Sequence, residues 1–257
     1  MRSTPLCKER PWPVCPHLRG ADPPMLNDLW DIIVMIDERR RIRRRARLSG
    51  VAALLALAAQ PAQARLVSWP DGSMLMTAND SRAYSLMYSY STDARTAFGY
   101  TAEYWREADW QFHGVQANRL LKRWNFPDAQ ANIYAFGAVG GAYSTGGLTD
   151  GDWEPAGFLG FEADVEDRRY YASYEARLYE AGDIDGFFMQ KARIGIAPYV
   201  AKFNETHLWL LLQVDHYPES DDPVEFTAFV RVFKGNLWAE AGVSDTGEPL
   251  FNLTYQF

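Results

Sequence analysis

The amino-acid sequence predicts an all-β fold, an antiparallel up-and-down β-barrel of twelve strands, with ten or eight strands as alternatives. From residue 73 onward, apolar and polar side chains alternate in short segments separated by turn residues, as expected for strands with one apolar and one polar face. Phe, Tyr and Trp make up 14% of the chain, and these residue types favour strands. No apolar run reaches the ~20 residues that a spanning helix needs.

Residues 1–64 are not expected to belong to this fold. Seven arginines within residues 39–47 precede an apolar stretch, residues 48–59, and then Ala62-Gln63-Ala64. A basic segment, a short apolar segment and an Ala-x-Ala site make up a secretory signal peptide. We therefore expect residues 35–64 to be a signal for the general secretory pathway, cleaved between Ala64 and Arg65.

Residues 1–34 do not fit a signal peptide, because they are rich in proline and carry both cysteines, Cys7 and Cys15. We interpret them as an upstream extension produced by a misplaced start codon, with Met35 as the true start. The alternative is an unusually long signal sequence. The rest of the chain has no cysteine, so neither a disulfide framework nor a thiolate metal site is available there.

The net charge of −7 conceals an asymmetry between the two parts of the chain. Residues 1–64 carry 11 Lys and Arg against 6 Asp and Glu, a balance of +5, which leaves −12 for the remainder. Nucleic-acid partners need a basic surface. The predicted barrel is acidic, and we therefore exclude nucleic acid as a partner.

The predicted strands follow one another along residues 73–257. The alternating segments, bounded by their apolar members, are Tyr84–Tyr90, Phe98–Tyr104, Leu159–Val165, Tyr170–Leu178, Ala192–Ile196, Leu208–Val214, Val224–Val232, Leu237–Val243 and Phe251–Phe257. A weaker segment covers Ser73–Ala78. Two stretches, His113–Trp124 and Asn132–Tyr143, lack a clean alternation, and we expect bulges or close packing of small residues there.

Two sets of connections alternate along the chain. Shorter turns are expected at 92–94, 125–130, 167–168, 203–205 and 234–236. Longer loops are expected at 79–82, 106–109, 144–155, 181–186, 218–223 and 244–248. An even strand number with short turns at one end and longer loops at the other is typical of bacterial membrane barrels.

The last strand carries the most specific pattern, because Phe251, Leu253, Tyr255 and Phe257 alternate with polar residues up to an aromatic end. This tail resembles the C-terminal strand of bacterial outer-membrane β-barrels, which their assembly machinery reads. The block Leu120–Asn132 is similar to an uncharacterised group of exported barrel proteins, and it implies no activity.

The resemblance implies a Gram-negative outer-membrane location, with residues 65–72 as a periplasmic segment and 73–257 as the barrel. It also implies membrane lipid, lipopolysaccharide and the assembly machinery as partners. The tail is expected to pair with Ser73–Ala78. Alternation alone fits a soluble periplasmic binding barrel as well, which remains the third interpretation.

The polar faces of the predicted strands carry many charges, which are expected to line the lumen. They are Glu103, Glu162, Asp164, Glu166, Glu175, Arg177, Lys191, Arg193, Asp215, Glu225, Arg231 and Glu240. These charges either line a narrow cation-preferring pore or pair across neighbouring strands and fill a structural barrel. The second interpretation is preferred, and the sequence assigns no reaction.

A lipid-modifying enzyme, of the acyl hydrolase or deacylase type, is the alternative function. Its candidate residues are His113 and His216, which are expected near the outer end of the barrel where acyl chains are reached. No Gly-x-Ser-x-Gly or metal-binding His motif accompanies them, and so they are weak candidates for catalysis.

The predicted outer loops are acidic, and no cofactor or dedicated metal site is expected in them. Their carboxylates are Asp80, Asp150, Asp152, Glu154, Asp183, Asp185, Glu219, Asp221, Asp222, Asp245 and Glu248. Such groups can hold Ca²⁺ or Mg²⁺ loosely together with lipopolysaccharide phosphates. Asp150-Gly-Asp152 is the tightest pair, but it lacks the other ligands of a calcium loop.

Overall fold

The computed structural model describes residues 66–202 and 205–257, which all belong to the second of the two units into which the chain divides, residues 61–257. The strands are β1 (Ser73–Thr77), β2 (Ala83–Ser91), β3 (Thr96–Trp105), β4 (Trp110–Asn125), β5 (Ala129–Ser144), β6 (Trp153–Asp167), β7 (Tyr170–Ala181), β8 (Asp185–Ile196), β9 (His207–His216), β10 (Val224–Lys234), β11 (Leu237–Ser244) and β12 (Pro249–Gln256). One short 3-10 helix, η1 (Gly147–Thr149), lies between β5 and β6. In this part of the chain no helix is long and apolar enough to cross a membrane.

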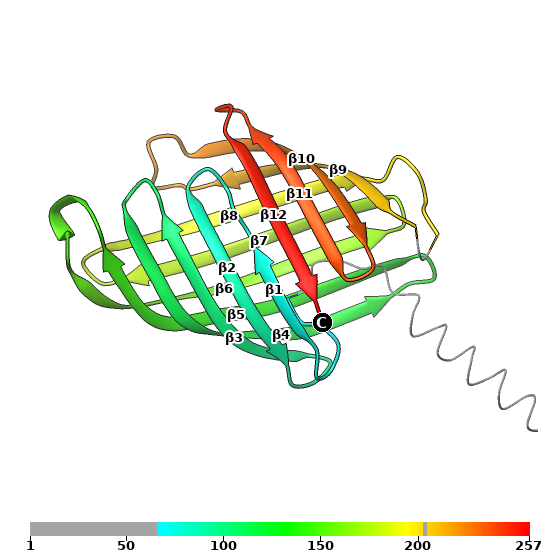
Figure 1. Cartoon of the computed structure of the whole chain (residues 1–257), viewed down its shortest axis with the longest axis horizontal. Coiled ribbons are helices and arrows are strands. Elements are labelled where there is room, and N and C mark those ends of the chain that lie inside the picture. Colours follow the sequence, from blue (N-terminus) through cyan, green and yellow to red (C-terminus); the bar gives the residue numbers. More distant parts are fainter. Residues whose placement is uncertain (1–65, 203–204) are drawn as a thin grey trace, which may run out of the picture. The chain divides into compact units, whose positions relative to one another are not determined.

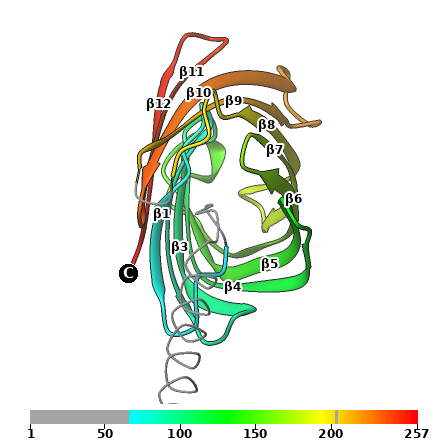
Figure 2. The same ribbon diagram turned by 90° about the vertical axis from the view of Figure 1, so that its right-hand side faces the viewer.

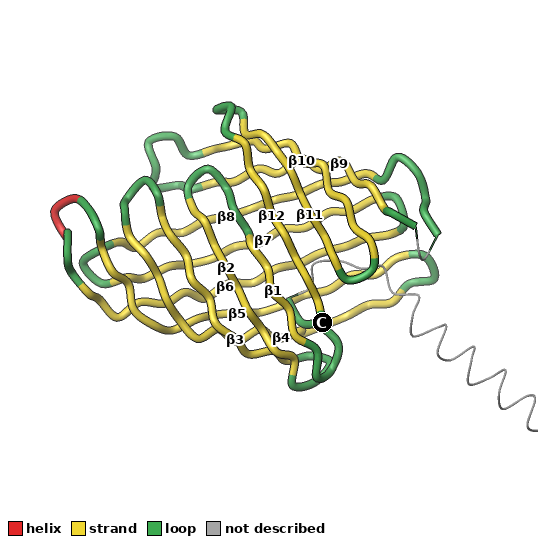
Figure 3. The backbone as a smooth tube through the Cα atoms, in the orientation of Figure 1, coloured by secondary structure: helices red, strands yellow, loops and turns green. Residues whose placement is uncertain are grey.

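The predicted closed barrel of twelve antiparallel strands is confirmed. Each strand pairs with its neighbours in sequence, and β1 pairs with β12 to close the ring (Figures 1 and 3). Met74 lies opposite Gln256, so the weak first segment and the tail pair as the sequence predicts. The main-chain amides of Ser73 and Phe257 each donate to the other's carbonyl oxygen, at 2.7 and 2.9 Å. Closure gives each of the twelve described strands a paired neighbour on both sides.

The two faces differ in polarity along many of the strands, although β4 has Trp110 and Phe112 on its inner face and Gln111 and His113 on its outer face. Along β10, Phe226 and Val230 point outward and are exposed, whereas Glu225, Thr227 and Arg231 point inward and are buried. The same division holds along β2, β3, β9 and β12. Apolar side chains therefore cover the outside of the barrel, and polar side chains occupy much of its inside. Figure 2 shows the ring of strands that surrounds this interior.

The connections divide between two ends, which we call the terminal rim and the loop rim. The terminal rim, where β1 begins and β12 ends, holds 92–95, 126–128, 168–169, 197–206 and 235–236. The loop rim holds 78–82, 106–109, 145–152, 182–184, 217–223 and 245–248.

The connection predicted to be a short turn at 203–205 is longer in the structure, and residues 203 and 204 lie outside the described residues. Strand β8 ends at Ile196 and β9 begins at His207, so the longest connection lies at the terminal rim, among the turns predicted to be short. Pro198 has no N–H to donate to a strand ladder, and β9 pairs with β8 only from Leu210 onward. The predicted segment Ala192–Ile196 thus ends where β8 ends, and residues 197–202 belong to the connection.

The irregular stretch His113–Trp124 contains the expected bulge. Leu120 pairs with Tyr134 and Lys122 pairs with Ile133, which leaves Leu121 as the extra residue. A bulge shifts the alternation by one residue, and so the consecutive residues Leu121 and Lys122 are both exposed after buried Leu120. This explains why the alternation loses its phase in this stretch.

Strands β4 and β5 approach each other closely where two glycines face one another. Gly114 is paired with Gly140, and a Cβ on Gly140 would lie 2.0 Å from the His113 carbonyl oxygen and 2.5 Å from the Gly114 Cα. Any side chain at 140 would therefore push the strands apart. The segment Asn132–Tyr143 is rich in glycine and lacks a clear alternation of apolar and polar residues, and this pattern reflects the close contact.

Candidate functional site: the barrel interior

The charged residues predicted to line the lumen lie on the inner face of the strands. Glu103, Asp164, Glu166, Asp215, Glu225, Arg231 and Glu240 are buried, and Glu162, Glu175, Arg177, Lys191 and Arg193 are half-buried. They do not form one continuous cluster. Most of them belong to three groups of opposite charges, and each group joins residues from at least two strands.

The first group joins a loop to the opposite wall of the barrel. Asp80 in the connection 78–82 folds inward and is only 5% exposed, with its Oδ2 atom 3.4 Å from Lys191 Nζ on β8. Lys191 Nζ also lies 3.5 Å from Asp215 Oδ1 on β9. The sequence-based placement of Asp80 among the acidic outer loops is therefore wrong, because an alternation pattern cannot show that a loop turns into the lumen.

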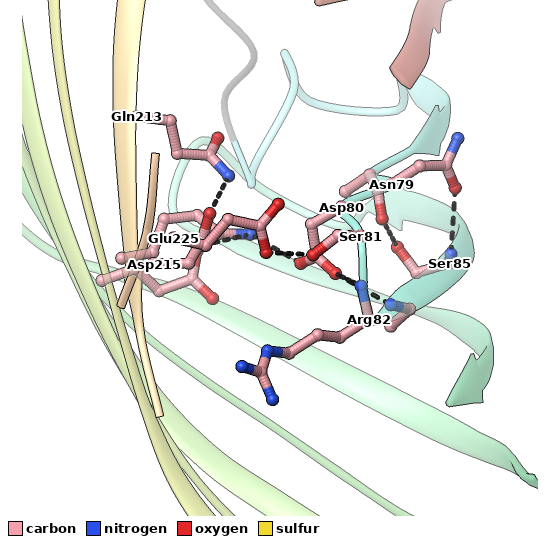
Figure 4. A network of polar contacts seen from close by, with 12 residues as sticks. Asn79, Asp80, Ser81, Arg82, Ser85, Gln213, Asp215 and Glu225 are labelled. Atoms are coloured by element: carbon pink, nitrogen blue, oxygen red, sulfur yellow. Dashed lines mark hydrogen bonds and ion pairs between the residues drawn. The ribbon is translucent and has the colours of Figure 1, made fainter. Parts of the chain in front are cut away.

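The main chain and neighbouring side chains hold the loop 78–82 in this inward position. The amides of Arg82 and Ala83 donate to Asp80 Oδ1 at 3.0 and 2.8 Å. Ser81 donates its hydroxyl to Glu225 on β10, and the Asn79 amide donates to Asn252 Oδ1 on β12 at 2.6 Å. Figure 4 shows this network from close by. We call residues 78–82 the inner loop.

The second group connects β3 with β7. Arg177 Nη1 lies 3.0 Å from Glu103 Oε1, and Arg177 Nη2 lies 2.7 Å from Glu175 Oε1. The Tyr179 hydroxyl donates to the other oxygen of Glu103. The Arg177 guanidinium also lies 4.7 Å from the centre of the Phe158 ring, a cation–π distance.

The third group is a buried triad of two arginines around one carboxylate. Glu240 Oε1 on β11 accepts from Arg231 Nε on β10 at 2.6 Å and from Arg193 Nη1 on β8 at 3.3 Å. Asn252 Nδ2 donates to Glu240 Oε2 at 3.3 Å. Glu240 thus neutralises charge from two other strands of the wall.

Carboxylates outnumber cations inside the barrel. The described inner carboxylates are Glu103, Glu162, Asp164, Glu166, Glu175, Asp215, Glu225 and Glu240, joined by Asp80 from the inner loop, and the strands contribute Arg123, Arg177, Lys191, Arg193 and Arg231 as cations. A lumen with this balance favours cations over anions.

The terminal rim is covered from inside by the start of the described chain. Leu66, Val67 and Ser68 are buried, and the apolar pair packs in a cluster with Met74 and Met87. The Ser68 amide donates to Ser91 Oγ at 2.8 Å. The expected periplasmic segment 65–72 therefore contributes, in its described part, to filling one end of the barrel.

A cavity of about 370 Å³ opens at the loop rim. Its floor is aromatic and consists of Trp105, Phe187 and Tyr217. Its rim carries four carboxylates, from Glu107, Asp185, Glu219 and Asp221, and one cation, Arg82. Sequence reasoning did not group these residues, because they come from five separate strand ends and loops.

Burial, together with the negative charges of Asp80 and Asp215, raises the pKa of the Tyr217 hydroxyl well above its ordinary value. Tyr217 follows the last residue of β9. Its hydroxyl therefore stays protonated and neutral at physiological pH.

The two candidate catalytic histidines lie on the outside of the barrel. His113 Nδ1 is 2.6 Å from the Tyr100 hydroxyl, and His216 Nδ1 is 3.2 Å from Gln190 Nε2. They stand on β4 and β9, which are not neighbouring strands. Neither has a serine or a carboxylate among the side-chain hydrogen-bond partners found in the described residues. The structure therefore does not assemble a catalytic triad around either one.

The predicted assembly signal lies on the outer face of β12. Phe251, Leu253, Tyr255 and Phe257 are all exposed, and the rings of Tyr255 and Phe257 stack with centroids 5.5 Å apart. The predicted cleavage residues Ala62, Ala64 and Arg65, the signal segment 35–64 and the extension 1–34 lie outside the described residues.

The acidic loops do not gather into a metal centre. Among residues 66–202 and 205–257, no three His, Cys, Asp or Glu side chains stand close enough together to hold a metal ion. The loose binding of Ca²⁺ or Mg²⁺ together with lipopolysaccharide stays a prediction.

Comparisons with known proteins add little to this geometry. No protein-family model matches the chain. No curated protein matches it either. A solved structure from a study described as "Unveiling the Mechanism Behind the in-meso Crystallization of Membrane Proteins" is similar over 72% of this chain and 81% of that one, with a TM-score of 0.36 and 11% identity.

Proposed function

We propose that residues 73–257 form an integral outer-membrane β-barrel of a Gram-negative bacterium, with a structural role and a lumen bridged by side chains. The observation that carries this proposal is the sidedness of the wall, which is apolar on the outside and carries the buried charges, together with many aromatic side chains, on the inside. A soluble barrel has the opposite arrangement, because water would meet the polar face. Lipid is the surrounding that matches an apolar outer face.

The size of the apolar outer surface supports a membrane location. Exposed large apolar residues occur on every strand, for example Leu75 on β1, Leu159 on β6 and Leu212 on β9. Soluble monomers rarely expose contiguous apolar patches above a few hundred Å². Each square ångström of apolar surface that moves from water to lipid contributes about 25 cal/mol of favourable transfer free energy. A surface of this extent therefore strongly favours insertion into a bilayer.

Aromatic residues near both rims fit the interfaces of a membrane. Tyr84 and Tyr104 lie close to the loop rim, and Trp124, Tyr170 and Tyr255 close to the terminal rim. Tyr and Trp prefer the headgroup region because one part of each ring system is apolar and one part is polar. Lipid and lipopolysaccharide are therefore the proposed surroundings, reached through general secretion and the barrel-assembly machinery.

The bridges across the interior favour a structural role over a wide pore. Asp80 and Lys191 join the inner loop to β8, and Glu103 and Arg177 join β3 to β7. Charged pairs of this kind would have to separate before large solutes could pass.

Fractionation tests the membrane proposal. Expressed from its full gene, the protein is expected to stay with outer membranes after washing with high salt and carbonate, and to migrate faster on a gel before boiling than after it. A folded barrel resists detergent until it is heated, and this produces the two positions. Release by carbonate, with a single gel position, would overturn the proposal.

A small cation-selective pore is the second candidate, because carboxylates outnumber cations in the interior. We expect wild-type protein in planar bilayers to give rare, small, cation-selective openings. Asp80→Asn should make openings more frequent, because it removes the charge that holds the inner loop to Lys191. Asp150→Asn, in the loop 145–152, is the control with the same charge change.

The conductance experiment can contradict either of the two candidate functions. Large, stable channels in wild-type protein would contradict the structural role. The absence of openings in wild-type protein and in Asp80→Asn alike would contradict the pore.

A further inference from the structure

The cavity at the loop rim combines an aromatic floor with an acidic edge. The rings of Trp105 and Phe187 meet edge to face, with centroids 4.7 Å apart and an interplanar angle of 69°, and Tyr217 lies 6.2 Å from Phe187. Trp105 and Tyr217 are more than nine-tenths buried. A volume of about 370 Å³ lies within the range of small-molecule sites, about 300–1,000 Å³.

The floor already holds one cation of the protein itself. The Arg82 guanidinium lies 4.5 Å from the centre of the Tyr217 ring. Its Nη1 atom donates to Glu107 at 3.0 Å and to Ser220 at 2.8 Å, and its Nη2 atom donates to the Asp222 carbonyl oxygen. The ring face is therefore presented to positive charge, as in sites that bind cations through aromatic rings.

Arg82 does not neutralise the edge of the cavity. The carboxylates of Glu219 and Asp221 stand on the same edge as Glu107 and Asp185, so negative charge exceeds positive charge around the opening. This balance repels phosphates and carboxylates and attracts cations. A lipopolysaccharide headgroup is therefore not a suitable occupant.

Two polar atoms of the floor, Trp105 Nε1 and the Tyr217 hydroxyl oxygen, lack hydrogen-bond partners among the described residues, and both atoms are buried. Because neither atom is exposed to the cavity, the rings and the carboxylates of the edge are the groups that an occupant would contact.

We propose that this cavity binds a small organic cation of the ammonium type. The aromatic floor would contact the ammonium group, and the carboxylates of Glu219 and Asp221 would supply the opposing charge. Binding needs only the folded barrel and is independent of whether the lumen conducts ions.

Choline is a suitable probe, because it carries a quaternary ammonium group and a hydroxyl. Titration of the purified, folded barrel in detergent is expected to give saturable binding by calorimetry and a change in tryptophan fluorescence through Trp105. The neutral isostere 3,3-dimethylbutan-1-ol has the same shape without the charge, and it should not saturate the site. Glu219→Gln with Asp221→Asn should weaken choline binding about tenfold by removing two opposing charges.

The matched control is Asp150→Asn with Asp152→Asn, which removes the same charge from residues that do not line the cavity. This variant should bind choline as the wild type does, and heat-dependent gel migration should verify that both variants are folded. Equal binding of choline and the isostere, an equal loss in the two variants, or no saturable binding in wild-type protein would each overturn the proposal.

Discussion

Glu240→Ala is expected to destabilise the folded barrel by about 3–5 kcal/mol. Glu240 is the shared partner of Arg193 and Arg231, at 3.3 and 2.6 Å. Without it, Arg193 keeps only the neutral acceptor Gln213 Oε1 among the described residues, and Arg231 loses its carboxylate partner. Burying a charge without a counter-charge is costly. The free energy of unfolding should be measured by urea titration of barrels folded into lipid vesicles, followed by tryptophan fluorescence.

A triple variant distinguishes two causes of this destabilisation. One is the loss of the attraction between Glu240 and the arginines, and the other is the cost of burying arginines without a counter-charge. Glu240→Leu with Arg193→Met and Arg231→Met replaces the triad by apolar groups of similar size. Apolar replacements of buried ion triads are often neutral or stabilising, and so most of the stability lost in Glu240→Ala should return. If the triple variant is as unstable as Glu240→Ala, the destabilisation does not come from unpaired arginines.

The fold could be predicted from the sequence because each strand carries its own local signal. Alternation separated the apolar face from the polar face, along β10 from Val224 to Val232 and along β12 from Phe251 to Phe257, and the structure shows that the apolar face is the exposed one. The even strand number led to the pairing of the weak β1 with β12. The first inference needs only the order of neighbouring residues and the second needs only the number of strands. Both can be obtained from the sequence without knowledge of three-dimensional contacts.

Contacts across the lumen could not be predicted in the same way. Asp80 meets Lys191, and Glu103 meets Arg177, over long separations in sequence that depend on the tilt of the strands and the width of the barrel. Alternation shows that a side chain points inward but not which side chain it meets. The inward turn of residues 78–82 and the assembly of the cavity at the loop rim follow from this three-dimensional arrangement.

The connection 197–206 illustrates a second limit. Alternation ends the predicted segment at Ile196, where β8 ends, but the turn was expected only at 203–205. Pro198 has no N–H to donate to a strand ladder, and the apolar residues Tyr199 and Val200 are exposed at the terminal rim. An apolar residue in a membrane barrel can be exposed either in a strand or in a connection, and composition alone does not separate the two.

Val230→Arg is expected to destabilise the membrane-inserted barrel by about 2–4 kcal/mol. Val230 lies in the middle of β10, is 43% exposed, and has Leu210 and Ala241 beside it on the neighbouring strands. An arginine there would face lipid near the centre of the bilayer and would have to reach towards a rim or draw water inward. Urea titration in lipid vesicles measures the difference in unfolding free energy from the wild type.

Asn236→Arg is the matched control, because residue 236 is exposed in the turn between β10 and β11 at the terminal rim. The same added charge should change the unfolding free energy by less than about 1 kcal/mol near the interface. In a soluble barrel, Val230→Arg would replace an apolar residue facing water and would leave stability unchanged or improve solubility. A neutral result at 230 would therefore contradict the assignment of the apolar outer face to lipid, and a loss confined to 230 would support it.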